Sequence, residues 1–252
     1  MQTDLPYILA LNFQKGIGDL TARKIIQFFG SASSAWNSKP KDLMQISGIG
    51  QQISKDFGNK KYLDLAYNEI EYCKNNDINI LTYYDDDYPD LLKECMDAPL
   101  VIFTKGNIDF NQVTNKKISI VGTRKMTNYG RNFIAELIEG ISEFDVTIIS
   151  GLAYGCDIEA HSQSLKNKVK TWSVMRTNFE RIYPASHKKI AHEMLQNGGW
   201  ITEQPSFRAV VPEAFLQRNR IIAGLSDVTI VVESAFKGGS LVTAKFANEY
   251  NR

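Results

Sequence analysis

The second half of this 252-residue sequence predicts a doubly wound α/β domain built on a mostly parallel sheet. Short apolar runs alternate there with amphipathic stretches of helical length. The runs at residues 118–121 and 228–232 are almost continuously apolar, which is typical of parallel strands covered on both faces. Helices between such strands return the chain to the same edge of the sheet. These observations together indicate a Rossmann-like domain at residues 111–252.

The elements of this domain follow one another in strict alternation. The strands are expected at residues 118–121, 146–149, 169–175, 200–203 and 228–232. The helices are expected at residues 128–144, 157–165, 188–197, 218–225 and 241–250. A parallel sheet usually leads its last helix into another strand. The chain stops at Arg252, so we expect the domain to be truncated at its C-terminus.

Residues 1–62 predict a small all-helical domain of the helix-hairpin-helix or SAM-like type. Two Gly-Ile-Gly turns, at residues 16–18 and 48–50, each precede a helical stretch. Glycine permits the sharp turn and leaves backbone N–H groups at a helix start, where they can face a phosphate. The same turns occur in protein-interaction modules, so both uses stay open for this domain.

Residues 63–110 are expected to form a connecting α/β segment that packs on the core of the larger domain. It contains predicted helices at 63–75 and from Leu91, and predicted strands at 78–83 and 100–103. The acidic run at residues 85–87 comes just before Tyr88 and Pro89. Consecutive carboxylates point in different directions on a regular backbone, and Asp is a common turn residue. We therefore interpret the run as a solvated turn and not as a metal site.

The composition excludes several classes of protein. With 43% hydrophobic and 23% charged residues the chain is ordinary globular material. No apolar run approaches the ~18 residues that span a bilayer, and the N-terminus lacks the pattern of a signal peptide. Three widely spaced cysteines fit reduced thiols better than disulfides or a zinc site. We expect a cytoplasmic protein without membrane contact.

The charge is unevenly distributed along the chain. Residues 1–110 contain 11 Lys and Arg against 15 Asp and Glu, whereas residues 111–252 contain 18 against 13. This difference favours the second half as the part that meets a polyanion, although ordinary surface charge explains it equally well.

Glycines and hydroxyl residues follow three of the predicted strands. Open α/β sheets bind ligands at the carboxyl ends of their strands. The residues at this edge are Gly122, Thr123 and Arg124 after the first strand, Ser150 and Gly151 after the second, and Lys237, Gly239 and Ser240 after the fifth. Glycine allows close backbone approach, hydroxyls donate hydrogen bonds, and a guanidinium suits a phosphate. The loops therefore predict a phosphate-binding edge.

A second basic group begins the helix at residues 218–225. Arg218 and Arg220 flank Asn219, and such a group can follow a nucleic-acid backbone or stack on a base. The alternative is that the arginines pair with carboxylates such as Glu213 or Glu233. We favour nucleic-acid contact because the three phosphate loops belong to the same domain.

The sequence shows no catalytic or cofactor motif. Neither a G-x-G-x-x-G nor a G-x-x-x-x-G-K-[ST] loop is present, and His161, His187 and His192 lack metal-ligand spacing. Ser150 has glycine on one side only, which argues against a nucleophile elbow. We interpret Asp157 and His161, which share one helix, as braces of that helix and not as an acid–base pair. No cofactor and no metal are expected.

Five motifs occur in a fixed order along the chain. They read S-I-V-G-T-R-x-x-T-x-Y-G at 119–130, S-G-L-A-x-G-x-D-x-x-A-H at 150–161, R-I-Y-P at 181–184, R-N-R-I-I-A-G-L-S at 218–226 and G-S-L-V-T-A at 239–244. In order and spacing they resemble the DNA-processing protein A (DprA/Smf) family, and the resemblance covers essentially the whole chain.

The resemblance implies a non-enzymatic protein that binds single-stranded DNA. Members of the family protect incoming DNA during natural transformation (competence) and help load the RecA recombinase for DNA recombination; full-length relatives commonly form homodimers. By position, the resemblance assigns phosphate and strand contacts to Gly122, Thr123, Arg124, Ser150, Gly151, Arg218, Asn219 and Arg220, with Lys188 and Lys237 as additions.

Two positions depart from the family pattern. The third strand of the family ends in V-L-G-x-G-L-D, whereas residues 174–180 read V-M-R-T-N-F-E. The loop has lost its glycines, and Arg176 offers a charge instead while Phe179 offers a ring for stacking on a base. Before R-N-R the family has F-P-x, and residues 215–217 lack this proline, so the turn that leads into the helix is expected to be looser.

Two other functions stay open at this point. One is a nucleotide-processing enzyme similar to the LOG-type phosphoribohydrolases, which carry a P-G-G-x-G-T loop with a catalytic Glu. The corresponding residues 237–240 read K-G-G-S, with Glu233 as the nearby acid. The other is a small-nucleotide sensor that uses the helical N-terminus for protein docking.

Overall fold

The computed structural model describes residues 4–209 and 214–252. The chain divides into two compact units. Unit 1 consists of Met1–Tyr88 and Met96–Ile102, and unit 2 consists of Pro89–Cys95 and Phe103–Arg252. The boundaries at residues 62 and 110 that the sequence suggests stay predictions.

Unit 1 is mainly helical, which confirms the predicted helical region. Its elements are α1 (Leu5–Phe13), α2 (Asp19–Phe29), α3 (Ala32–Trp36), α4 (Pro40–Leu43), α5 (Gln51–Asp56), α6 (Lys60–Asn75) and β1 (Asn79–Thr82). The Gly-Ile-Gly turns lead directly into α2 and α5, as predicted. Gly16 and Gly48 have φ angles of 87° and 92°, a region that strains residues with a side chain.

The acidic run after β1 forms a turn. The Asp85 carboxylate accepts hydrogen bonds from the backbone N–H of Thr82 at 2.7 Å and from its hydroxyl at 2.9 Å. An Asp side chain that accepts from the backbone of a residue close by in the sequence is ordinary turn chemistry. The interpretation of this run as a turn is therefore confirmed.

Unit 2 alternates strands and helices. Its elements are α7 (Asp90–Lys93), most of β2 (Val101–Gly106), β3 (Lys116–Val121), α8 (Asn128–Gly140), β4 (Val146–Ser150), α9 (Cys156–Lys166), β5 (Lys170–Val174), a 3-10 turn (Ala185–His187), α10 (Lys188–Met194), β6 (Gly198–Thr202), α11 (Ala214–Gly224), β7 (Val228–Val231) and α12 (Gly239–Tyr250). The predicted alternation is confirmed. Across the described ranges, no helix has the length and apolarity that crossing a bilayer requires.

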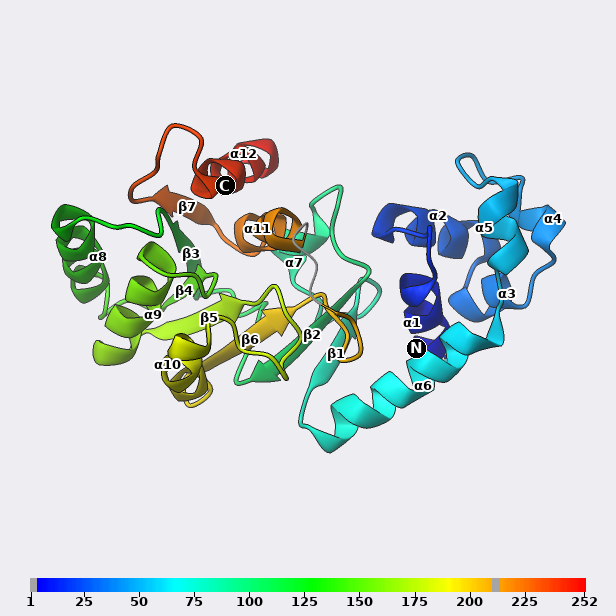
Figure 1. The fold of residues 1–252 in the computed structure, drawn as a ribbon, viewed down its shortest axis with the longest axis horizontal. Coiled ribbons are helices and arrows are strands. Elements are labelled where there is room, and N and C mark those ends of the chain that lie inside the picture. The colour runs from blue at the N-terminus through cyan, green and yellow to red at the C-terminus, as the bar shows by residue number, and fades with distance from the viewer. Residues whose placement is uncertain (1–3, 210–213) are drawn as a thin grey trace. The chain divides into compact units, whose positions relative to one another are not determined.

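The strands form one mixed sheet in the order β1-β2-β6-β5-β4-β3-β7. The neighbours from β6 to β7 are parallel, whereas β2 runs antiparallel to β6. Helices α8, α9 and α10 cover one face of the sheet, and α11 and α12 cover the other (Figure 1). The connections from β3 to β6 progress in one direction, and α11 then carries the chain back to the far side of β3. This reversal makes the carboxyl end of β3 the topological switch point, where open α/β sheets bind ligands.

The core between the sheet and helices α8 and α9 is aliphatic. Ile120 and Ile148 from the sheet pack with Ile134 and Ile138 from α8, and all four side chains are fully buried. Burying an isoleucine side chain stabilises the fold by roughly 1.5–3 kcal/mol. This core fixes the strands whose ends carry the loops described below.

Two strands differ from the expected pattern. None of the residues of β7 is buried, because β7 is an edge strand and is not covered on both faces as its apolar sequence suggested. Strand β6 starts at Gly198, before its predicted start at Trp200, and Gly198 and Gly199 pair with Thr171 and Trp172. A Cβ at either glycine would overlap the backbone of a neighbouring strand, so these glycines belong to the sheet and not to a turn.

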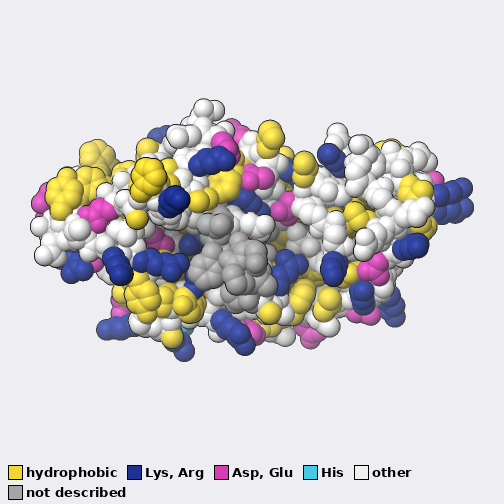
Figure 2. All heavy atoms as spheres, turned by 45° about the horizontal axis from the view of Figure 1, so that its top comes forward, with side chains coloured by type: hydrophobic (Ala, Val, Ile, Leu, Met, Phe, Trp, Pro, Cys, Tyr) yellow, Lys and Arg dark blue, Asp and Glu magenta, His cyan; other side chains and the backbone are white. Residues whose placement is uncertain are grey.

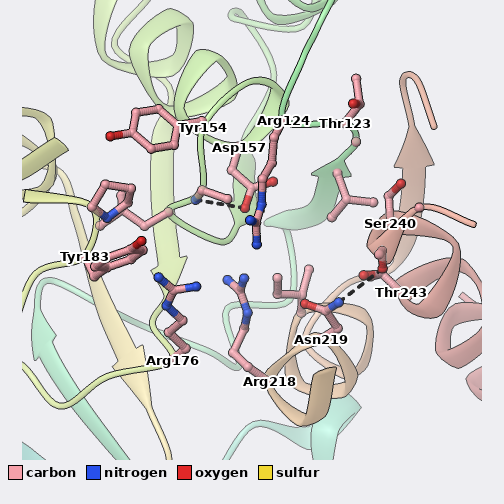
Figure 3. Close-up of a pocket in the computed structure, with 18 of the residues that line it drawn as sticks. Thr123, Arg124, Tyr154, Asp157, Arg176, Tyr183, Arg218, Asn219, Ser240 and Thr243 are labelled. Carbon is pink, nitrogen blue, oxygen red and sulfur yellow. Dashed lines mark hydrogen bonds between the residues drawn. The ribbon is translucent and has the colours of Figure 1, made fainter. Parts of the chain in front are cut away.

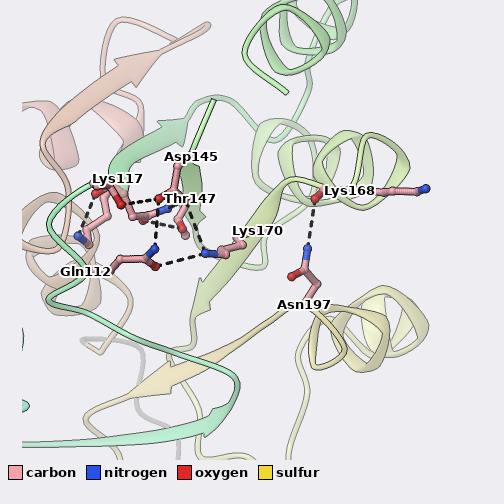
Figure 4. Close-up of polar contacts among 9 residues, drawn as sticks. Gln112, Lys117, Asp145, Thr147, Lys168, Lys170 and Asn197 are labelled. Atoms are coloured by element: carbon pink, nitrogen blue, oxygen red, sulfur yellow. Dashed lines mark hydrogen bonds and ion pairs between the residues drawn. The ribbon is translucent and has the colours of Figure 1, made fainter. Parts of the chain in front are cut away.

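Asp145 ties the segment before β3 to the amino ends of the strands (Figure 4). Its carboxylate accepts hydrogen bonds from Asn115 Nδ2 at 2.8 Å, Thr114 Oγ1 at 2.9 Å and Gln112 Nε2 at 3.2 Å. The Lys170 ammonium lies 3.6 Å away. These hydrogen bonds, first that from Asn115, lower the pKa of Asp145 below its ordinary value. The charged form of Asp145 therefore stabilises the folded chain.

We expect Asp145→Ala to lower the melting temperature at neutral pH. A carboxyl whose pKa is lowered by folding contributes stability above its unfolded pKa of about 3.9 and loses that contribution as the pH falls through its folded pKa. The difference in melting temperature between wild type and Asp145→Ala should therefore shrink below about pH 4. Thermal melts followed by circular dichroism test this, with the exposed Glu143→Ala as the control. A difference that stays constant down to acid pH would contradict the role of the carboxylate.

Candidate functional site

A pocket of about 420 Å³ opens at the carboxyl ends of the parallel strands. The loop after β3 and the start of α12 border it on one side, and the loops after β4 and β5 border it on the other. The predicted residues that line it are Gly122, Thr123, Arg124, Arg176, Arg218, Asn219, Gly239 and Ser240. The switch point of the sheet therefore brings together residues from four separate loops and helices.

Three arginines supply the positive charge of this pocket. Arg124 follows β3, Arg176 follows β5 and Arg218 lies on α11, and Figure 3 shows their guanidinium groups pointing toward one another. Arg218 is 8% exposed, and its Nη1 donates a hydrogen bond to the Val174 carbonyl at 2.6 Å. Its Nε has no hydrogen-bond partner within the described part of the chain. Arg218 thus lies at the floor of the pocket and is held there by the end of β5.

Asp157 is the carboxylate that faces these arginines. It accepts a hydrogen bond from the Ala153 N–H at 3.2 Å. Burial raises the pKa of Asp157 and lowers the pKa of Arg218, while their mutual attraction opposes both changes. Burial and the neighbouring Arg218 lower the pKa of Arg176 to about 10, which leaves it charged at neutral pH. Among the residues that line the pocket, three cations face one carboxylate, so the pocket attracts anions.

Two exposed tyrosines stand at the rim of the pocket. Tyr154 is 50% exposed and Tyr183 is 56% exposed. The Arg176 guanidinium lies 3.9 Å from the centre of the Tyr183 ring. The Tyr154 hydroxyl lies 3.0 Å from Ser186 Oγ. The rim therefore combines stacking surfaces with cations.

The sequence did not single out these tyrosines as site residues. Tyr183 belongs to the R-I-Y-P motif, so its position in a motif was a usable signal. Tyr154 occupies a variable place of the second motif, which gave no signal. Thr243 also lines the pocket and was not predicted, because nothing in the sequence shows which face of α12 meets the loops.

Two predicted glycines serve the packing of the protein itself. A Cβ at Gly151 would overlap the Arg218 guanidinium, and a Cβ at Gly122 would overlap the Cys156 side chain. The expectation that these glycines make room for a ligand therefore needs correction, because protein atoms occupy the space. Gly151 lets Arg218 approach β4 closely, and Gly122 lets α9 approach β3.

Several predicted residues lie outside the pocket lining. Ser150 is buried and its hydroxyl donates to the Ile120 carbonyl at 2.5 Å. The half-buried Phe179 packs against Trp200 at a ring-centre distance of 5.7 Å. Lys188 and Lys237 are exposed.

Arg220 forms an ion pair, although not with the carboxylates that we considered. Its Nη2 lies 2.6 Å from Glu203 Oε2, and Arg220 is 8% exposed. Glu233 instead accepts hydrogen bonds from the backbone and hydroxyl of Thr127. Glu213 and the side chains of residues 215 and 216, where the missing proline was noted, lie outside the described residues.

His161 braces its helix, α9, against β5 and the loop after β4, as the sequence interpretation suggested. Its Nε2–H donates to the Gly151 carbonyl at 2.6 Å, and Nδ1 lies 2.7 Å from Thr171 Oγ1. Burial lowers the pKa of His161 to about 4, so the ring is neutral at neutral pH. A neutral ring with Nε2 protonated can only accept at Nδ1. The Thr171 hydroxyl, which also lies 3.0 Å from the Ile148 carbonyl, is shared between the two. His161 therefore positions Gly151 and, through it, Arg218.

The fold and the pocket define a Rossmann-like α/β protein with a cationic pocket at the switch point of its sheet. The family model of DNA recombination-mediator protein A matches residues 79–252. The chain belongs to this family, which confirms the resemblance noted in the sequence.

Similar proteins agree with this assignment. Protein Smf from Synechocystis is 33% identical over 98% of this chain and 62% of that protein. The DNA processing protein DprA from Bacillus subtilis is 34% identical over 84% of this chain and 69% of that protein. The chain thus spans about six tenths of the length of the Synechocystis relative, and 57% of a relative from Mycobacterium tuberculosis.

Two solved structures share the fold. The X-ray structure of DprA from Streptococcus pneumoniae has a TM-score of 0.77 and 28% identity, and the match covers 98% of this chain and 84% of that chain. A structure of DprA from Helicobacter pylori, which concerns the single-stranded DNA binding mode of that protein, has a TM-score of 0.62 and 28% identity over 69% of this chain and 77% of that chain.

We expect Gly151→Ala to destabilise the fold by about 1–3 kcal/mol, because the added Cβ displaces the Arg218 guanidinium from a closely packed position. Urea denaturation measures this change. Gly140→Ala is the matched control, because a Cβ at Gly140 meets no atom within 4 Å. Equal stability of the two variants would contradict the packing role of Gly151.

The neutral state of His161 predicts a loss of stability in mild acid. Folding lowers the pKa of His161 from 6.5 to about 4. The neutral ring therefore contributes fully to the free energy of unfolding above pH 6.5, and about 3 kcal/mol of this contribution is lost as the pH falls toward 4. The stability difference between wild type and His161→Gln should shrink by this amount over the same range. Urea denaturation across this pH range measures it, with His192→Gln, at an exposed position, as the control variant. A constant difference for His161→Gln would rule out the proposed titration.

Proposed function

We propose that this chain binds single-stranded DNA through the arginine pocket and acts as a DNA recombination mediator without enzymatic activity. The observation that carries the proposal is the convergence of Arg124, Arg176 and Arg218 at the switch point of the sheet (Figure 3). Guanidinium groups bind phosphates through paired, charge-assisted hydrogen bonds. Membership of the recombination-mediator family and the single-strand binding of the Helicobacter pylori protein support it.

The rim of the pocket favours a single strand over a duplex. Tyr154 and Tyr183 expose ring surface next to the cations, and unpaired bases stack on such rings. Figure 2 shows Lys and Arg side chains beside hydrophobic side chains on one face of the molecule, with Asp and Glu side chains among them. Phosphate contact and stacking carry little base information, so binding should tolerate many sequences.

Each group of the pocket has a role in this proposal. Arg124, Arg176 and Arg218 contact phosphate oxygens. The N-terminus of α12 adds backbone N–H groups near Gly239, and its helix dipole favours an anion there. Side chains of Thr123, Asn219 and Ser240 supply further hydrogen bonds. Lys188 and Lys237 extend the path of the strand beyond the pocket.

Four residues take a different part from the one that the sequence suggested. Tyr183 replaces Phe179 as the stacking residue, because Phe179 packs against Trp200. Ser150, Gly151 and Arg220 support the pocket walls without reaching the ligand.

The wider role of the protein follows from the family and not from the pocket. We include in the proposal protection of incoming DNA in natural transformation, loading of the RecA recombinase, assembly as a homodimer, and residence in the cytoplasm. Family membership and the relatives named DprA support these parts.

A nucleotide-processing enzyme fits the geometry less well. Such an enzyme needs an available carboxylate beside the bound nucleotide. Glu233 does not line the pocket and is engaged by Thr127, while Asp157 is buried and held by Ala153 and Arg218. We therefore favour binding without catalysis.

The test is fluorescence anisotropy of a labelled oligonucleotide, single-stranded against double-stranded, across a salt series. We expect Arg124→Ala to weaken single-strand binding by about tenfold, as loss of a charged hydrogen bond does. It should also reduce the negative slope of log K against log salt by about 0.7, because each neutralised phosphate contributes this amount on single strands.

The matched control is Arg131→Ala. Arg131 is 59% exposed in its side chain, lies on α8 outside the pocket and pairs with Glu159 at 3.7 Å. Like Arg124→Ala, the substitution Arg131→Ala removes one positive charge from unit 2. Equal losses in both variants would mean that overall charge and not the pocket binds DNA, and no binding at low salt would overturn the proposal.

A further inference from the structure

The charge of the pocket exceeds what one internal phosphate of DNA neutralises. Its lining carries the positive charges of Arg124, Arg176 and Arg218 against the single negative charge of Asp157. The balance is a net charge of about +2 when all four groups are ionised. An internal phosphodiester brings one negative charge, whereas a terminal phosphate monoester brings about −1.5 to −2 near pH 7.

The arginines are positioned for one shared anion. Their guanidiniums point toward one another and not along a path (Figure 3). After burial, the neighbouring Arg218 is the next largest cause of the lowered pKa of Arg176. Cations that are crowded in this way gain most from a ligand that carries more than one charge, because each added charge interacts with all of them.

The dimensions of the pocket suit the end of a strand. A volume of about 420 Å³ lies within the range that holds one small ligand, which corresponds to one nucleotide. The Arg176 guanidinium lies on one side of the Tyr183 ring, at 3.9 Å from its centre, and more than half of Tyr183 is exposed. A nucleotide whose base meets the exposed part of Tyr183 therefore lies close to Arg176.

We propose that the pocket is a receptor for the terminal phosphate of a single DNA strand, in which Arg176 selects a phosphate monoester over an internal phosphodiester and Tyr183 stacks the terminal base. This inference rests on the proposed single-strand binding and makes it more specific. It assigns to Arg176 a role in specificity, while Arg124 and Arg218 contact any phosphate that enters.

The experiment compares single-stranded oligonucleotides of one sequence and length that differ only at their ends. They carry a 5′-phosphate, a 3′-phosphate, no terminal phosphate or a 5′-phosphate methyl ester, and a circular form has no end. In competition for binding to the full chain, we expect one of the two phosphorylated strands to have about tenfold higher affinity than the unmodified and circular strands. The methyl ester should lose this advantage, because it keeps the bulk and removes one charge.

The variant Arg176→Gln separates specificity from a structural role. We expect it to bring the affinity ratio of phosphorylated to unmodified strand close to one, because the phosphorylated strand loses more affinity than the unmodified strand. Arg131→Gln should leave the ratio unchanged. A general loss of structure would instead weaken all ligands alike, and retention of the ratio in Arg176→Gln would overturn the assignment of this residue.

The outcomes for wild type separate the two proposals. Equal affinity for circular, unmodified and phosphorylated strands would overturn the terminal-phosphate receptor and leave single-strand binding intact. Failure of every strand to bind would remove the proposed function itself. Calorimetry with dAMP against deoxyadenosine gives a second measurement without any variant, and equal heats for the two would also contradict the inference.

Discussion

The pocket of this protein depends on the position of one buried guanidinium. Arg218 reaches from α11 across the ends of β4 and β5, where it donates to the Val174 carbonyl and lies against the backbone of Gly151. A buried cation is tolerated only where it is paired and hydrogen-bonded, and Asp157 provides the opposite charge. The residues that meet at this point belong to different strands and helices, so the arginine links the two faces of the sheet.

The surroundings of Arg218 are themselves constrained by groups that never reach the surface. Gly151 has no side chain and therefore admits the arginine, and its carbonyl is held by the neutral His161 ring. His161 in turn is held by Thr171 on β5. The pocket floor is therefore set by a buried polar layer in which His161 bonds to both Gly151 and Thr171, an arrangement that rigidifies a site.

The sequence predicted the order of strands and helices well, because buried parallel strands produce an apolar pattern that is easy to recognise. It predicted the location of the pocket as well, because ligand sites in such sheets follow from topology. The prediction failed where tertiary packing determines which side chains face the pocket. Nothing local distinguishes Arg218, which lines the pocket, from Arg220, which pairs with Glu203, since both follow from the way one helix is rotated. The packing of Gly151 against Arg218 and the exposure of Tyr154 also depend on tertiary structure, so the sequence did not predict them.

The pairing of β7 with β3 has a consequence for the order of events during synthesis. The backbone N–H of Lys117 donates to the Asp227 carboxylate, and the N–H of Asp227 donates to the Lys117 carbonyl, across a separation of 110 residues. Contacts between segments so distant in sequence form late and close a large loop. A nascent chain on the ribosome therefore has most of its parallel sheet before it has a complete pocket. A chain that has not yet formed β7 and α12 thus lacks one wall of the pocket.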